Sequence, residues 1–257
     1  MRTRSGPSSA DRAARSVVEV GYREHRAPEH LRGLVECAWT TGAMDEPAHV
    51  LPDGCMDLIR MDGTVIVAGP DTFTSVTGPR AEAVAGLRFR PGALPRLLGV
   101  PAAELRDTRV PLTDLTSTPP APTLTGLASA LAAGRPDAET APWGLPVLEH
   151  VTRRLAAGAA VGAVAGEIGT SSRTLQRQCA AVYGYGPATL RRVLRFRRSV
   201  RMLRDGLPYA QVAARAGYAD QPHLHREARA LSGLSLGQLA NGANRSTTVP
   251  SGSSTVA

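Results

Sequence analysis

The last third of the chain carries a weak internal repeat, which constrains its fold more than any other feature. The segment VAGEIGTSSRTLQRQCAAVYG aligns with VAARAGYADQPHLHREARALSG when one residue is inserted. Each copy contains a short helical stretch, a glycine, a second helical stretch and a closing glycine, and glycine permits the tight turn between two crossed helices. The repeat therefore predicts two helix-turn-helix units. The paired positions are Val164/Val212, Ala165/Ala213, Gly169/Gly217, Leu175/Leu224, Arg177/Arg226 and Gly184/Gly233.

The second helix of each copy is amphipathic in the same phase, at about 100° per residue. Its apolar face is expected to be Leu175, Cys179 and Val182 in the first copy and Leu224, Ala228 and Leu231 in the second. The opposite face holds Arg, Gln, His and Ser side chains, which hydrogen-bond to base edges and phosphates in a major groove. Double-stranded DNA is therefore the expected partner. The predicted faces are Ser172, Arg173, Gln176 and Arg177 in the first copy and Gln221, Pro222, His225, Arg226 and Arg229 in the second.

Capping residues support both helices. Ser171 or Ser172 and, in the second copy, Asp220 are predicted N-caps, and Pro222 suits the first turn, where its missing N–H costs little. The histidines His223 and His225 are two residues apart, so their side chains diverge by about 160° on a helix and cannot readily share a metal. Only His225 falls on the predicted DNA face.

The segment between the copies, PATLRRVLRFRRSVRMLRDG at residues 187–206, predicts one long helix with apolar residues at helical spacing. Such a helix would hold two recognition helices about 34 Å apart, the separation of successive major-groove turns on one side of a duplex. The alternative is a basic helical bundle whose charge only solvates it. The matched phases of the two copies favour DNA binding.

Charge is concentrated in this same region. Residues 144–240 contain 14 Arg against 5 Asp or Glu, whereas the rest of the chain has 16 Arg against 17 acids. This asymmetry points to a polyanion, either nucleic acid or an anionic membrane surface. No run of 18 apolar residues predicts a membrane span, and the three cysteines do not form a secreted disulfide pattern. A cytoplasmic protein without a membrane partner is expected.

The first half of the chain has a mixed, partly β pattern. Two apolar runs around Asp62 and Gly63 predict a hairpin, AVAGLRFR predicts a strand that stops at Pro91-Gly92, and ALPRLLGVPAAELRD predicts short helical pieces. The expected fold class is α+β: a mixed, β-rich sensing domain followed by an all-α DNA-binding domain. The predicted organisation is a disordered tail at 1–17, a sensing domain at 18–115, a linker with a helix at 123–133 within 116–145, the DNA-binding domain at 146–240, and a disordered tail at 241–257.

The basic region resembles the AraC/XylS family of bacterial transcription regulators. The resemblance lies in AGEIGTSSRTLQRQ, LRFRRSVRML and VAARAGYADQPHLHREA, and it covers about residues 146–240. It implies a seven-helix DNA-binding domain, and RNA polymerase is a further candidate partner of such a regulator. Three positions depart from the family pattern: Cys179 and Leu224 stand where Phe is usual, and Ser199 where Ala is usual. The base or phosphate contacts that the resemblance implies are Ser172, Arg173, Gln176, Arg177, Gln221, Pro222, His225 and Arg226.

The N-terminal half also resembles a known region, through VLPDGCMDLI, GLRFRPGA and LLGVPAAEL. Together these resemble an uncharacterised domain that precedes the DNA-binding domain in some actinobacterial AraC-type regulators. By that resemblance it would bind a small-molecule effector or mediate self-association as a homodimer.

Two local patterns are candidate sensor sites. His49, Asp53, Cys55 and Asp57 suggest a metal or thiol sensor; the alternative is a turn at Pro52-Asp53-Gly54 with Cys55 as a small buried residue. A structural zinc site would need four well-placed ligands, and no close cysteine pair occurs, so no metal or cofactor is expected.

Arg88 and Arg90 are predicted on one strand face, opposite Leu87 and Phe89, where they would bind an anionic ligand or would be solvated or paired with acids. Trp39 and Trp143 are expected to be core or interface residues. No catalytic motif supports an enzyme. An enzyme or covalent thiol sensor in the N-terminal domain, with DNA binding as a secondary activity, remains the alternative hypothesis.

Overall fold

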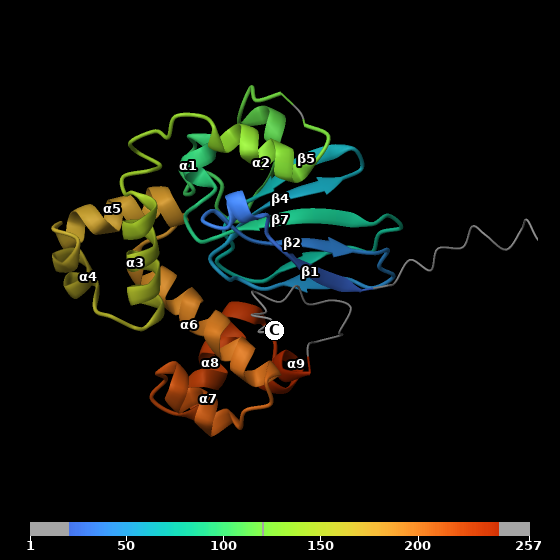
Figure 1. Cartoon of the computed structure of the whole chain (residues 1–257). Coiled ribbons are helices and arrows are strands. Elements are labelled where there is room, and N and C mark those ends of the chain that lie inside the picture. Colours follow the sequence, from blue (N-terminus) through green and yellow to red (C-terminus); the bar gives the residue numbers. More distant parts are fainter. Residues whose placement is uncertain (1–20, 120, 242–257) are drawn as a thin grey trace, which may run out of the picture.

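The computed structural model describes residues 21–119 and 121–241. The tails predicted at residues 1–17 and 241–257 therefore lie outside the described part of the chain, apart from Asn241. The N-terminal half is β-rich and the C-terminal half is helical (Figure 1). The predicted α+β fold class is confirmed.

The N-terminal half is built on a six-stranded antiparallel sheet with the order β1-β2-β7-β4-β5-β8. A separate antiparallel ribbon is formed by β3 (Ala48–Val50) and β6 (Ser75–Thr77), and is called the β3–β6 ribbon below. The sheet strands are β1 (Tyr22–Arg26), β2 (Val35–Thr41), β4 (Met56–Met61), β5 (Thr64–Ala68), β7 (Val84–Phe89) and β8 (Arg109–Pro111).

The hairpin and the strand expected from the sequence are present. β4 and β5 are joined by Asp62 and Gly63, whose φ angles of 50° and 73° are those of a two-residue turn that follows the strand twist. β7 ends at Phe89, directly before Arg90 and Pro91. Leu87 and Phe89 are fully buried on one face of the sheet, as predicted.

Two helices, α1 (Pro95–Leu98) and α2 (Leu124–Ala132), lie over this face of the sheet and complete its core (Figure 1). The core joins Leu58 and Phe89 of the sheet with Leu94 and Leu127. Short 3-10 turns at Glu29–Leu31 and Leu112–Asp114 contribute Leu31 and Leu112 to it. The opposite face of the sheet, with Trp39 and Val84, carries a smaller apolar cluster.

From Leu145 to the end of the described residues, the C-terminal half forms helices joined by turns. α6 passes between two apolar cores, contributing Leu190 and Val193 to the first and Phe196 and Val200 to the second. The long helix expected from the sequence is therefore present, and one rigid element joins both units. The helices are α3 (Leu145–Ala156), α4 (Val161–Glu167), α5 (Ser172–Tyr183), α6 (Pro187–Arg204), α7 (Tyr209–Ala216), α8 (Gln221–Ser232) and α9 (Leu236–Ala240).

The two repeat copies have the same turn. Gly169 and Gly217 have φ angles of 68° and 79°, in the left-handed region that glycine adopts without strain. In the first copy the N–H of Thr170 donates to Ala165 O at 2.9 Å, and in the second the N–H of Tyr218 donates to Ala213 O at 2.9 Å. Because Ala165 and Ala213 are paired positions of the repeat, the predicted helix-turn-helix units are confirmed at the level of single hydrogen bonds. Within the described residues, no helix is long and apolar enough to cross a bilayer.

Candidate nucleic-acid interface and ligand pocket

Helix α5 buries its apolar side and exposes its polar side as the sequence predicts. It begins after Ser171, whose Oγ accepts a hydrogen bond from the N–H of Thr174 at 3.1 Å. The predicted core residues Leu175, Cys179 and Val182 are at most 1% exposed. The predicted DNA face, made of Ser172, Arg173, Gln176 and Arg177, is exposed.

Helix α8 repeats this arrangement. The carboxylate of Asp220 accepts a hydrogen bond from the N–H of His223 at 2.6 Å, and Pro222 lies in the first turn. The core positions Leu224, Ala228 and Leu231 are buried. The face predicted to contact DNA is exposed, and consists of Gln221, Pro222, His225, Arg226 and Arg229.

The two histidines of α8 have different surroundings. His223 is half-buried, its Nδ1 lies 3.3 Å from the N–H of Ala219, and its ring meets that of Tyr218 edge-on with centroids 5.3 Å apart. His225 is exposed and lies edge-on to Tyr209. No group of His, Cys, Asp and Glu residues within the described ranges could hold a metal ion. His223 therefore supports the turn, and only His225 faces outward.

The three departures from the family pattern are accommodated in the core. Cys179, Ser199 and Leu224 are fully buried, and the Ser199 hydroxyl donates to Phe196 O at 2.8 Å. The buried Ser199 hydroxyl therefore has a hydrogen-bond acceptor.

Two arginines of α6 hold α8 in place. Arg192 Nε and Arg195 Nη2 lie 2.8 Å and 3.4 Å from the same oxygen of Glu227. The Arg195 guanidinium also lies over the ring of Tyr218, 4.3 Å from its centroid. These two cations therefore hold α8 and the adjoining Tyr218 against α6.

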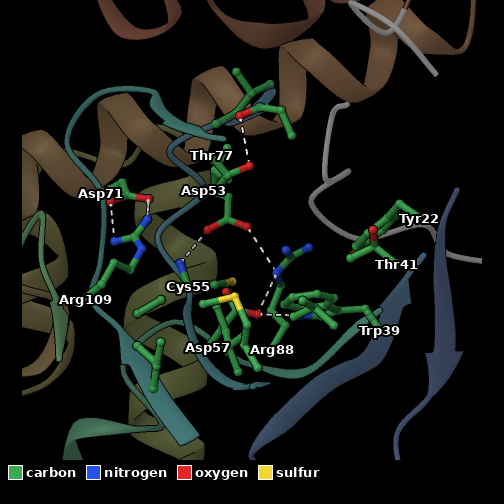
Figure 2. Close-up of a pocket in the computed structure, with 18 of the residues that line it drawn as sticks. Tyr22, Trp39, Thr41, Asp53, Cys55, Asp57, Asp71, Thr77, Arg88 and Arg109 are labelled. Atoms are coloured by element: carbon green, nitrogen blue, oxygen red, sulfur yellow. Dashed lines mark hydrogen bonds and ion pairs between the residues drawn. The ribbon is translucent and has the colours of Figure 1, made fainter. Parts of the chain in front are cut away.

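A cavity of about 200 Å³ lies in the N-terminal half, on the sheet face opposite α1 and α2 (Figure 2). Its walls come from the main sheet and from the β3–β6 ribbon, and most of them are apolar. The apolar lining includes Met44, Val50, Leu51, Ile59, Met61, Ile66 and Val84.

A buried ion cluster forms one side of this pocket. Arg88 Nε lies 3.5 Å from Asp53 Oδ2 and 3.6 Å from Asp57 Oδ1. Burial by itself would lower the pKa of Arg88, but the two aspartates raise it, so the guanidinium stays charged. Burial raises the pKa of Asp57 to about 6, against the opposing effect of the Arg88 charge. On the far side, Glu24 Oε1 also lies 3.5 Å from Arg88 Nη1.

Trp39 and Tyr22 form an aromatic wall beside this cluster. The indole N–H of Trp39 donates to Asp57 Oδ1 at 2.8 Å, and the two ring centroids lie 5.9 Å apart. The indole fits against β7 because residue 86 is glycine: a Cβ there would lie 2.3 Å from the ring. The sequence thus places a small residue on one strand to make room for the aromatic side chain of its neighbour.

A second ion pair lies on another side of the pocket. Arg109 on β8 binds Asp71 through two nitrogen–oxygen contacts of 3.0 Å and 2.8 Å. Arg109 also donates to Ser75 Oγ at 3.1 Å, which ties it to the β3–β6 ribbon. Figure 2 shows this pair on the opposite side of the cavity from Tyr22 and Trp39.

The structure separates the predicted sensor residues. Asp53, Cys55 and Arg88 line the pocket together, whereas His49 is not among the lining residues. The prediction that Arg88 and Arg90 share a strand face is wrong, because β7 ends at Phe89. Arg90 is exposed, and its Nε–H donates to Arg32 O at 2.8 Å.

Cys55 matches the simpler of its two interpretations. The side chain of Asp53 accepts the N–H of Cys55 at 2.8 Å, which closes the expected turn. Cys55 is 4% exposed, and burial raises the pKa of its thiol. Because the thiolate is the reactive form, this environment disfavours a thiol sensor.

Sequence reasoning missed most of the pocket. Trp39 was expected only as a core or interface residue, and Asp71 and Arg109 were not singled out. These residues lie on different strands and loops, and no local spacing in the sequence connects them.

Several residues outside the pocket contact the first helix-turn-helix unit. The N–H of Ala102 donates to Ala181 O near the end of α5 at 2.7 Å. Arg96 Nη1 donates to Trp143 O at 3.0 Å. Gly92, with a φ angle of 78°, approaches the same unit so closely that a Cβ would lie 2.6 Å from Val182.

The second unit is held by the pocket walls themselves. Leu51 lines the pocket and also belongs to the second apolar core with Phe196 and Val200. The N–H of Thr74 donates to Leu231 O near the end of α8 at 3.1 Å. Thr74 lies between two lining residues, Asp71 and Thr77.

Between the two units, the turn at residues 53–55 packs on α6. The guanidinium of Arg197 lies 3.5 Å from Cys55 Sγ and forms an ion pair with Glu36. Gly54 faces Leu190 and Leu194, and a Cβ there would lie 3.6 Å and 3.4 Å from their side chains. The same short turn therefore lines the pocket and contacts the helix that both units share.

Two helix-turn-helix units on one shared helix define the class of protein as a DNA-binding transcription regulator. Residues 164–242 match a family described as a helix-turn-helix domain, of the AraC/XylS type, and residues 23–111 match a domain of unknown function, DUF6597. The chain therefore carries a helix-turn-helix domain of the AraC/XylS type in its C-terminal half, preceded by a DUF6597 domain.

Several solved structures are similar in part. ToxT from Vibrio cholerae is 11% identical with a TM-score of 0.44, covering 85% of this chain and 98% of that one. ToxT with bound unsaturated fatty acid is 9% identical with a TM-score of 0.40, covering 79% and 90%. The C-terminal domain of AraT, a response regulator from Geobacillus stearothermophilus, is 19% identical with a TM-score of 0.35, covering 38% and 85%. With TM-scores below 0.5, none of these structures defines the function of this chain. No curated protein matches it in sequence.

Proposed function

We propose that the chain is a sequence-specific regulator in which α5 and α8 enter successive major-groove segments, under the control of a small molecule bound in the N-terminal pocket. In this proposal, residues 18–115 are the sensing domain, residues 116–145 the linker and residues 146–240 the DNA-binding domain. The observation that carries the DNA-binding part is that α5 and α8 expose matching polar faces. The long helix α6 joins the two units to which these helices belong.

The proposed contacts combine positioning and base recognition. Arg177 and Arg226 are exposed and equivalent in the repeat, and a guanidinium can bind guanine O6 and N7 in a bidentate way. His225 and Gln176 offer further hydrogen-bonding groups on the same faces. The proposed DNA-contacting residues are Ser172, Arg173, Gln176 and Arg177 on α5 and Gln221, Pro222, His225 and Arg226 on α8.

The control mechanism follows from the different attachment of the two units. Leu51 and Thr74 connect the pocket walls to the second unit, whereas Ala102 and Arg96 connect residues outside the pocket to the first. A ligand that displaces the β3–β6 ribbon would therefore move α8 relative to α5. It would regulate DNA binding only if its affinity differs between the DNA-competent and DNA-incompetent arrangements.

The first test is genome-wide mapping of the sites that the protein occupies, followed by electrophoretic shift with the operator so identified. Sites with two half-sites about one helical turn apart on one face of the duplex are expected. Affinity should also fall steeply with salt, because arginine–phosphate contacts release counterions. Occupied sites with only one conserved half-site would contradict the double-reading arrangement.

The second test concerns the pocket. Native mass spectrometry of the purified full-length protein should detect a retained small molecule, and its addition should change operator affinity. A ligand that binds without changing operator affinity would contradict the proposed control.

A further inference from the structure

The chemical class of the ligand can be inferred from which charges the pocket presents. The side chain of Arg88 is 3% exposed, whereas those of Asp53 and Asp57 keep 13% and 16% of their surface exposed while lining the cavity. The guanidinium thus lies behind the carboxylates, and a ligand meets the carboxylate oxygens first. Two carboxylates share this one cation on the pocket side, which leaves an excess of one negative charge.

The second cation of the wall does not offset this excess. Arg109 is bound to Asp71 by two short contacts, so that pair is neutral by itself. Trp39 has already committed its N–H to Asp57, and the Tyr22 hydroxyl donates to Glu24 at 2.9 Å. On this wall, the carboxylates of Asp53 and Asp57 are therefore more exposed to a ligand than the donors of Arg88.

The aromatic wall adds to this preference. Trp39 and Tyr22 both line the cavity beside Asp57, as Figure 2 shows. The faces of aromatic rings attract cations, and the attraction is larger where water is excluded. The remaining lining is apolar and suits a hydrocarbon body. At about 200 Å³ the cavity is smaller than the roughly 300–1,000 Å³ of drug-sized sites, so the body is small.

One lining residue has the opposite preference. Arg80 is half-buried, its Nη2 lies 3.2 Å from Met44 Sδ, and among the described residues no carboxylate pairs with it. An anionic ligand would suit Arg80, but Asp53 and Asp57 would repel it from the more deeply buried side. Charges interact more strongly where burial reduces screening by solvent. The lining holds three aspartates and three arginines, so the preference for a cation rests on the more deeply buried position of Asp57 compared with Arg80.

We propose that the pocket binds a small organic cation, an amine with an aromatic or aliphatic body, with its ammonium group at Asp57 and Asp53 and its body against Trp39 and the apolar walls. The inference rests on the proposed role of the pocket as the effector site. Burial is the main cause of the raised pKa of Asp57, and the neighbouring charge of Asp53 adds to it.

The decisive experiment compares three probes with the same body on the full-length protein: 2-phenylethylamine, 2-phenylethanol and 3-phenylpropanoate. Thermal shift and isothermal titration at pH 7.5 should show that the amine binds about tenfold or more tightly than the other two. Binding of the carboxylate as tight as that of the amine would overturn the assignment. So would the absence of amine binding up to about 1 mM.

Two variants locate the ammonium group. Asp57→Asn removes the charge but keeps an oxygen that can accept the Trp39 N–H, so the preference for the amine over the alcohol should disappear. Arg80→Gln removes a like charge and should raise amine affinity. If the carboxylate probe binds and Arg80→Gln abolishes that binding, the site takes anions. Should Asp57→Asn fail to fold, Asp53→Asn gives the same comparison.

The pH dependence provides an independent readout. Asp57 is charged above its pKa of about 6 and becomes neutral below it, so amine affinity should fall as the pH drops from 7 to 5. The other charges that face this carboxylate are those of Asp53, Arg88 and Arg109, and the Asp57→Asn protein keeps all three. The fall in amine affinity between pH 7 and pH 5 that Asp57 causes should therefore be absent from the Asp57→Asn protein. Flat amine affinity over this range in the wild-type protein would contradict a role for Asp57.

Operator affinity is measured in the same samples. Amine binding without a change in operator affinity supports the ligand class and contradicts the control mechanism proposed above. A change in operator affinity caused by the carboxylate and not by the amine supports the control mechanism and contradicts the ligand class.

Discussion

The two helix-turn-helix units have the same local structure but different attachments to the rest of the molecule. Both have a left-handed glycine in the turn and the same hydrogen bond across it. The first is contacted by Ala102 and Arg96, away from the pocket, whereas the second is contacted by Leu51, which lines the pocket, and by Thr74, which lies between the lining residues Asp71 and Thr77. Two copies of one motif therefore have different surroundings although their local structure is the same.

The largest effect is expected at the junction that both units share. Arg197→Met would leave Glu36 without its buried partner, which should lower the free energy of unfolding by about 3–5 kcal/mol. Adding Glu36→Gln should restore part of this loss, because the unpaired charge is then removed. Denaturant unfolding of the two single variants and the double variant measures the coupling. Strictly additive losses would show that the pair does not hold the junction.

Leu51→Ala tests the difference between the units directly. Leu51 is 7% exposed and packs in the second core, so its truncation should lower the free energy of unfolding by about 2–5 kcal/mol. Hydrogen exchange should show faster opening of α8 than of α5. Equal loss of protection in both helices would mean that the two units are not held separately.

The two units should contribute equally to DNA binding, although their attachments to the N-terminal half differ. Arg177→Ala and Arg226→Ala should each weaken operator binding by about 1–3 kcal/mol if each contact is bidentate to a base. The matched control is Arg135→Ala, which removes an exposed arginine from the loop before α3. Electrophoretic shifts that show full affinity for both variants would contradict the assigned faces.

The smallest effect is expected at the contact between the pocket wall and α8. Thr74→Val removes the hydroxyl that lies 3.3 Å from Leu231 O and leaves the backbone hydrogen bond in place. A loss of about 0.5–1.5 kcal/mol in the free energy of unfolding is expected. Its more specific consequence should be a reduced effect of the pocket ligand on operator affinity, measured by titration with and without ligand. An unchanged ligand effect would place the coupling at Leu51 or the 53–55 turn instead.

The helical half was predictable because its information is local. Helical periodicity, the Ser171 and Asp220 caps and the glycine turns act between residues a few positions apart, so α5 and α8 and their exposed faces follow from the sequence. The hairpin at Asp62-Gly63 was predictable for the same reason. Arg90 shows the limit of such reasoning, since alternation predicts a face but not the residue at which a strand ends.

The sequence alone determined two helix-turn-helix units, the exposed polar faces of their second helices and a β-rich half before them. Only the tertiary structure decided that Tyr22, Trp39, Asp57 and Arg88, from four strands, surround one cavity. The physical reason is that strand order depends on pairing between distant segments: β7 lies between β2 and β4 in the sheet although it follows both in the chain. The same long-range packing placed Leu51 of the pocket wall in the second core, and placed Ala102, outside the pocket, against the first unit.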